Sequence, residues 1–319
     1  MPSYGEKDIA FQPYPSRRSV VHSTNGIVAC SQPLAAQAGI KILREGGNAA
    51  DAAVAVAACL NVTEPTSTGI GGDAFCLFYD AKTRKIHGLN ASGRSPAALT
   101  LEKARTDLGL QGLERVERIP MDHVHSVTVP GAAAGWCDTV ERFGSGKLNM
   151  SQILSEAIRL AEEGYPVSQL TAMYWKQGER KLRAASPNYG EMLRNGEMAP
   201  RDGEIIKLKN LAKTFRELAE KGKKGFYEGP IAEAIVQVLK DRGGVMTLED
   251  LKSHGEQGSE ETEAICFEYE AAGVKIWEHA PNGQGLIALI ALGVLESLQK
   301  RGVVPEFGKS DGYKHNSAE

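Results

Sequence analysis

The sequence predicts a mixed α/β (α+β) fold. Short apolar runs of strand length are interspersed along the chain with longer amphipathic segments of helical period, a pattern typical of layered α/β proteins. The composition, 42% hydrophobic and 24% charged, is that of an ordinary globular protein and argues against intrinsic disorder. With 319 residues the chain fits two domains or one large α/β unit, and it is long enough to bury a full core.

The N-terminal part is expected to form an arm followed by two packed helices. Residues 1–18 are charged and proline-containing, which predicts an extended arm, and residues 28–30 predict a short strand. Ser31 is expected to cap a first helix that ends at the two glycines 46–47. Asn48 is expected to cap a second helix, which is so rich in alanine that its neighbours must approach closely.

Two β-hairpins are predicted, one in each half of the chain. The first joins residues 74–79 to residues 85–90 through a polar turn, and the second joins residues 265–270 to residues 274–278. A turn-rich loop, residues 64–73, leads into the first hairpin.

The remaining elements are mainly amphipathic helices. A strand over residues 126–129 is expected to lead through Pro130 and Gly131 into a helix. Thr247 opens a sequence typical of a capping box. The predicted helices cover residues 132–142, 151–163, 208–221, 230–241 and 285–299.

Charge and apolar patterning exclude several classes of partner. The net charge is −3 and no Lys/Arg run stands out, so a nucleic-acid partner is not expected. The most apolar stretch, residues 52–60, is too short to span a membrane. The N-terminus has no apolar signal-peptide region, and the five scattered cysteines are typical of buried thiols. We therefore expect a cytoplasmic protein without a membrane partner.

Common catalytic and phosphate-binding motifs fail on inspection. The segment 144–147 lacks the upstream glycine and the Ser/Thr of a P-loop, and the glycines at 69, 71 and 72 lack the dinucleotide-binding context. The two histidines in residues 122–125 have no identifiable third ligand, so no metal site is predicted. No G-x-S-x-G nucleophile motif occurs. Residue chemistry alone therefore leaves an enzyme-like α/β body without a nucleophile.

An ordered set of motifs nevertheless resembles the large-subunit portion of the gamma-glutamyltranspeptidase family. The three longest are GIVACSQPLAAQAG (26–39), ILREGGNAADAA (42–53) and EPTSTGIGGDAF (64–75). Shorter ones follow in order at residues 129–136, 225–229, 243–251 and 281–285. No single motif is diagnostic, but their order from about residue 11 to 300 is highly specific.

This resemblance implies an N-terminal-nucleophile hydrolase with an αββα sandwich, of which residues 19–319 form the large-subunit part. Such precursors cleave themselves, and the small subunit then begins with a threonine that attacks a gamma-glutamyl or related amide. The threonine's own amine can serve as the base, and water or an amino acid takes the acyl group. The partners implied are this small subunit and a small amide substrate, and no metal or organic cofactor is implied.

No threonine of this chain occupies the nucleophile context. Thr63, Thr66 and Thr68 belong to the glycine-rich loop region, and Thr247 is a predicted helix cap. The sequence therefore predicts no catalytic residue in this chain, and an incomplete sandwich with apolar faces and strand edges uncovered. Two hypotheses remain: half of a glutathione hydrolase-like amide hydrolase or acyltransferase, or a truncated, inactive remnant that binds small acids.

The substrate-binding segment also departs from the family. Alignment on Pro96 places Ser92 where typical members hold an arginine for the substrate carboxylate. A neutral serine contributes only ~1 kcal/mol, against about 1.5–3 kcal/mol for a charge-assisted bond. Arg94 lies two residues further, about 6.6 Å along an extended strand. We therefore hypothesise that Arg94 partly replaces the missing cation, the alternative being a surface arginine or one that pairs with a neighbouring acid.

The loop before the first hairpin has a structural interpretation. Glycines 71 and 72 would permit close backbone packing near the subunit junction, and Asp73 would cap or pair locally.

Overall fold

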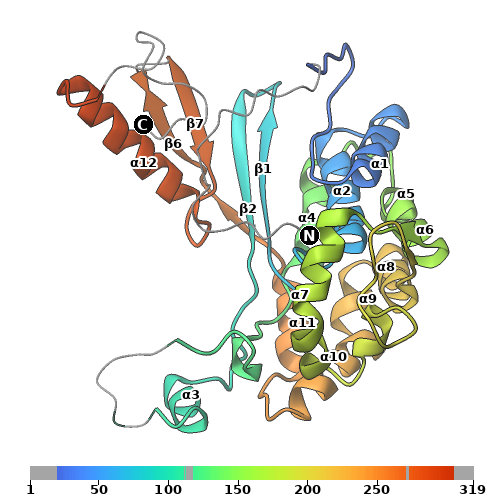
Figure 1. The fold of residues 1–319 in the computed structure, drawn as a ribbon. Coiled ribbons are helices and arrows are strands. Elements are labelled where there is room, and N and C mark those ends of the chain that lie inside the picture. Colours follow the sequence, from blue (N-terminus) through green and yellow to red (C-terminus); the bar gives the residue numbers. More distant parts are fainter. Residues whose placement is uncertain (1–19, 111, 113–117, 271–272, 305–319) are drawn as a thin grey trace, which may run out of the picture. The chain divides into compact units, whose positions relative to one another are not determined.

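A computed structural model describes residues 20–110, 112, 118–270 and 273–304 (Figure 1). Contacts divide the chain into two compact units, which are described separately. The larger unit is Asn25–Thr262, and the smaller contains Met1–Thr24 and Glu263–Glu319. The arm predicted for residues 1–18 lies outside the described residues, and the assignment of residues 19–319 to one domain stays a prediction.

The larger unit begins with two alanine-rich helices, α1 (Pro33–Arg44) and α2 (Ala49–Thr63). As predicted, Asn48 caps α2, and its side chain accepts hydrogen bonds from the amides of Ala50 and Asp51. The prediction that Ser31 caps α1 is wrong, because α1 starts after Gln32 and has no side-chain cap. Ser31 instead donates to Glu64 Oε2 at 2.7 Å. No strand forms at residues 28–30.

The first predicted hairpin is confirmed. Strands β1 (Ala74–Asp80) and β2 (Lys85–Ala91) pair antiparallel, and the short β5 (Glu260–Thr262) joins β2 in the order β1-β2-β5. One sheet face, which includes Cys76 and Leu89, borders a 120 Å³ apolar cavity that residues of α2 and α4 also line. The other face carries three exposed hydrophobic side chains of β1, namely Phe75, Leu77 and Tyr79, exposed by 44%, 39% and 57%.

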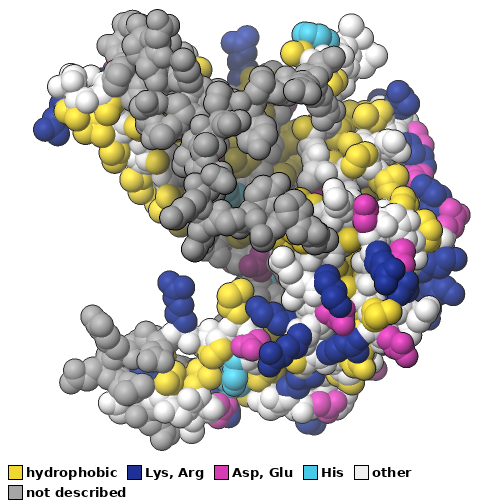
Figure 2. Space-filling view, viewed as in Figure 1, with side chains coloured by type: hydrophobic (Ala, Val, Ile, Leu, Met, Phe, Trp, Pro, Cys, Tyr) yellow, Lys and Arg dark blue, Asp and Glu magenta, His cyan; other side chains and the backbone are white. Residues whose placement is uncertain are grey.

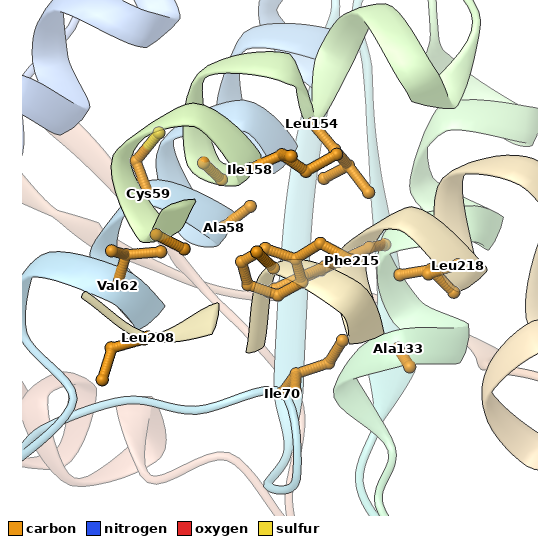
Figure 3. Packing of buried hydrophobic residues seen from close by; sticks show 14 of the residues in the cluster. Ala58, Cys59, Val62, Ile70, Ala133, Leu154, Ile158, Leu208, Phe215 and Leu218 are labelled. Carbon is orange, nitrogen blue, oxygen red and sulfur yellow. The ribbon is translucent and has the colours of Figure 1, made fainter. Parts of the chain in front are cut away.

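The other elements of the larger unit are mainly helices, most of which pack around a common core (Figure 1). Beyond α4 (Ala132–Phe143) they are α3 (Leu101–Asp107), η1 (Val124–Ser126), α5 (Met150–Ile153), α6 (Ser155–Glu163), β3 (Tyr165–Pro166), α7 (Gln169–Ala185), η2 (Tyr189–Met192), β4 (Ile205–Ile206), α8 (Lys209–Lys221), α9 (Lys223–Tyr227), α10 (Pro230–Lys240) and α11 (Leu248–Gln257). Phe215 of α8 lies fully buried in this core, near Leu154 of α5–α6 and Ala58 of α2 (Figure 3).

Two more sequence predictions in this unit need correction, and one helix was missed. The strand expected at residues 126–129 is absent, because Val129 makes a single backbone hydrogen bond to Arg94 at 2.9 Å and no ladder. The helix expected at 151–163 is divided after Ile153 into α5 and α6. Helix α7 was not predicted. The capping box at Thr247 is confirmed, since its side chain accepts from Asp250 N.

The smaller unit has a hairpin and a helix where the sequence predicts them. They are β6 (Ile265–Tyr269), β7 (Val274–Glu278) and α12 (Gly285–Lys300). The Tyr269 hydroxyl donates to Gln299 at 2.6 Å, which ties the hairpin to the end of α12. Within the residues described, no helix has the length and apolarity needed to cross a membrane.

Candidate functional site

The predicted binding segment, Ser92 to Arg94, follows β2 within the larger unit. Its backbone is fixed on both sides: Gly93 N donates to Asp73 Oδ1 at 2.7 Å, and Arg94 O accepts from Val129 N at 2.9 Å. Ser92 N donates to Asn90 Oδ1 at 2.9 Å. The local pairing expected of Asp73 is therefore confirmed, and its partner is the segment that carries Arg94.

The start of α4 lies against the same loop. The amides of Gly131 and Ala132 both donate to Gly72 O at 2.9 Å. Close packing falls on Gly131, where a Cβ would lie 2.1 Å from Ala91 O, whereas a Cβ at Gly71 would meet nothing within 4 Å. Within this chain the contact at the loop is made by the carbonyl of Gly72, and close packing by glycines 71 and 72 near the subunit junction stays a prediction.

The Arg94 guanidinium is held by three acceptors from the end of α11 and from β5. Nη1 donates to His254 Nδ1 at 2.8 Å and to Gly258 O at 3.4 Å, and Nη2 donates to Glu260 Oε1 at 2.7 Å. These contacts use three of the five N–H donors of an arginine. The Arg94 side chain is 32% exposed and that of Glu260 is 66% exposed, so their ion pair is a surface pair of small net energy.

His254 is the buried member of this group. It is 2% exposed, and its ring lies 5.5 Å from that of Tyr227. Because arginine only donates, Nδ1 must be the unprotonated nitrogen, and the neutral ring carries its proton on Nε2. Nε2 is buried and has no hydrogen-bond partner among the described residues. Burial, and then the positive charge of Arg94, lower the pKa of His254 to about 4.

A buried ion pair supports the turn that carries two of the acceptors. Asp138 of α4 accepts from Lys223 Nζ at 2.8 Å and from Ser259 N at 2.6 Å. Burial alone would raise the pKa of Asp138, but the Lys223 ammonium and the Ser259 amide outweigh it and hold the pKa below its usual range. Gly258 (φ +66°) fits here because a Cβ would lie 2.7 Å from Asp138 Oδ2. The network therefore fixes Gly258 O and the start of β5.

Sequence reasoning missed His254, Glu260 and Asp138. The structure brings Arg94 to an acid, Glu260, as one of the two sequence interpretations expects, and it also leaves part of the guanidinium exposed. A substrate role for Arg94 and Ser92 stays a prediction. The histidines of residues 122–125 make other contacts: His125 Nε2 lies 2.6 Å from Asp107 Oδ2, and His123 Nδ1 accepts from His125 N. Within the described ranges no group of three metal-ligating side chains forms.

Charged side chains elsewhere on the larger unit are interspersed. Lys/Arg and Asp/Glu alternate over the helices in Figure 2, and many form local pairs such as Arg159 with Glu156 at 2.8 Å. These pairs resemble a solvated surface rather than a site.

Comparison with known proteins identifies the family of this chain. The family model described as gamma-glutamyltranspeptidase matches residues 35–317. The glutathione hydrolase-like YwrD proenzyme of Bacillus subtilis is 34% identical over 283 residues, which are 88% of this chain and 50% of that protein. The chain therefore spans about half the length of this curated relative.

Solved structures agree. Gamma-glutamyltranspeptidase of Helicobacter pylori superposes with a TM-score of 0.80 at 29% identity, covering 93% of this chain and 80% of that one. Cephalosporin acylase from Bacillus halodurans gives a TM-score of 0.78 at 42% identity, covering 89% of this chain and 51% of that one. The chain belongs to the gamma-glutamyltranspeptidase family, and the predicted fold class is confirmed.

Proposed function

We propose that this chain is the large-subunit part of an amide hydrolase or acyltransferase that acts on a gamma-glutamyl or related small-acid amide. The observation that carries the proposal is the family match over residues 35–317, made to relatives about twice as long. The matched curated relative is a proenzyme, and the matched structures are a transpeptidase and an acylase. Each of the three names describes either an enzyme that transfers acyl groups from amides or the precursor of such an enzyme.

The second half of the same precursor would supply what this chain lacks. The exposed row Phe75, Leu77 and Tyr79 on one face of β1 is an apolar surface of the kind that a second sheet covers. Strand β1 is also an edge strand among the described residues, since its order in the sheet is β1-β2-β5. Both features support a small subunit packed against this sheet.

In the proposed reaction the small subunit's N-terminal threonine attacks the amide carbonyl. Its hydroxyl oxygen forms an ester with the acyl group, and the proton passes through its own amine to the departing amine. Water then cleaves the ester to release the acid, or an acceptor amine takes the acyl group as a new amide, and the threonine hydroxyl is regenerated. This chain contributes substrate binding: Arg94 would hold the carboxylate of the acyl group, and Ser92 would add a neutral hydrogen bond. Since Ser92 stands in the position of the family's arginine, the acid is expected to be displaced or shorter than gamma-glutamate.

The first experiment is intact-mass analysis of the native protein, followed by amide hydrolysis assays. Two associated chains and turnover of gamma-glutamyl, succinyl or oxalyl p-nitroanilide would support the enzyme. The R94M substitution should raise KM for the acidic amides and leave KM for butyryl p-nitroanilide, which has no carboxylate, unchanged. If wild type and R94M have the same KM for every acidic amide, a substrate-binding role of Arg94 is refuted.

The alternative is a protein that binds small acids without catalysis. A single native species near 34 kDa without amide turnover would support this alternative. A cytosolic location is part of either proposal and is supported by five unpaired cysteines, which suit a reducing compartment.

A further inference from the structure

We infer that His254 is a positioning residue that holds Arg94 in the orientation needed to bind the substrate's acid. The inference rests on the proposed function and deepens it, because it names a residue outside every recognised motif. His254 lies 160 positions from Arg94 in the sequence, yet its Nδ1 is 2.8 Å from Arg94 Nη1.

The placement of His254 is energetically unfavourable by itself. A neutral imidazole is buried to 2% exposure beside a cation, and its Nε2–H has no acceptor among the described residues. An unpaired buried donor costs about 1–3 kcal/mol. An apolar side chain at this place would avoid that cost, so packing alone does not explain a histidine here. The hydrogen bond that it accepts from Arg94 does.

The alternative anchor is weaker. Glu260 pairs with Nη2 at 2.7 Å, but its side chain is 66% exposed, and such pairs have a net energy of only about 0–1 kcal/mol. A substrate carboxylate can therefore displace Glu260 from the guanidinium. His254, which is neutral and buried, would keep Nη1 in place during that exchange without neutralising the positive charge.

The rear of the site is built to hold His254 and its neighbours. The Asp138–Lys223 pair fixes Ser259 N and thereby Gly258 O, the second acceptor of Nη1. Both acceptors of Nη1 thus come from backbone or buried side chains, while the acceptor of Nη2 is at the surface. This asymmetry fixes the Nη1 edge of the guanidinium and lets a substrate carboxylate replace Glu260 at Nη2.

Variants at position 254 separate positioning from packing. Asparagine places a carbonyl oxygen close to the position of Nδ1, whereas glutamine reaches toward the position of Nε2 and leucine offers no acceptor. We expect H254N to retain the hold on Arg94, and H254Q and H254L to lose it. H125N is the matched control, since His125 is also buried, at 5% exposure, and contacts Asp107 instead.

The primary test uses the native protein and does not depend on activity. In ¹⁵N NMR at neutral pH, Nδ1 of His254 should be the unprotonated, hydrogen-bonded nitrogen, and R94M should shift it to the position of an unbonded nitrogen. Phenylglyoxal should modify Arg94 about fivefold faster in H254L and H254Q than in wild type, H254N or H125N, which corresponds to loss of ~1 kcal/mol. An R94M spectrum identical to that of wild type, or equal modification rates in all variants, would overturn the inference.

The second test uses the assembled enzyme. H254L should raise KM for the acidic amides about fivefold or more, with kcat little changed. H254N should have a KM close to that of wild type. Unchanged KM in H254L would also refute the positioning role. If the wild-type enzyme hydrolyses no amide, the proposed function fails, and the NMR and modification results decide the link between His254 and Arg94 on their own.

Discussion

His254 should make the stability of this protein depend on pH in a way that can be calculated. Its pKa is about 4 in the folded chain against 6.5 for an ordinary histidine. The unfolded state therefore binds more protons between these values, and the free energy of unfolding falls as the pH falls from 6.5 toward 4. With ~1.36 kcal/mol per pKa unit, the loss between about pH 7.5 and 4.5 is roughly 2–3 kcal/mol.

The assay is urea unfolding of wild type and H254N at both pH values. Burial and Arg94 lower the pKa of His254, while Asp138, Asp73 and Glu260 oppose them and are present in both proteins. Carboxylates with lowered pKa values lose stabilisation in both proteins as they become protonated, so this contribution cancels in the difference. H254N should thus gain roughly 2–3 kcal/mol relative to wild type on acidification. If the free energies of unfolding of wild type and H254N differ by the same amount at both pH values, the lowered pKa of His254 is refuted.

Three packing predictions follow from buried contacts, each measured by urea or thermal unfolding. Y227F should destabilise the fold by about 2 kcal/mol, because the Tyr227 hydroxyl donates to Pro130 O at 2.6 Å and accepts from Ala134 N at 3.0 Å at the start of α4. Y174F is the control at an exposed tyrosine and should change the stability little. G131A should cost roughly 1–3 kcal/mol, since its Cβ meets backbone, whereas G71A enters open space and should be near neutral; equal effects would contradict the packing. D51A should cost about 1–2 kcal/mol by removing the N3 carboxylate of the α2 capping box, and an unchanged midpoint would show that the cap contributes nothing.

The sequence by itself determined the elements whose signals are local. An apolar run followed by a polar turn specifies the hairpin at residues 74–91, and the second hairpin is recognised in the same way. The helix after Gln284 is recognised by its apolar face. Asn48 and Thr247 were recognisable as caps because a capping box lies within four residues. The ordered motifs likewise gave the family, since they depend on sequence order alone.

Tertiary structure decided which residues meet at the site. Arg94 was visible in the sequence, but its partners His254 and Glu260 lie 160 and 166 positions away and share no motif with it. The three-residue strand β5, which places Glu260 beside Asn90, is too short for its pattern to predict it. The pKa of His254 depends on burial and on a cation brought near by folding. These properties arise from distances between remote segments, and no local propensity encodes them.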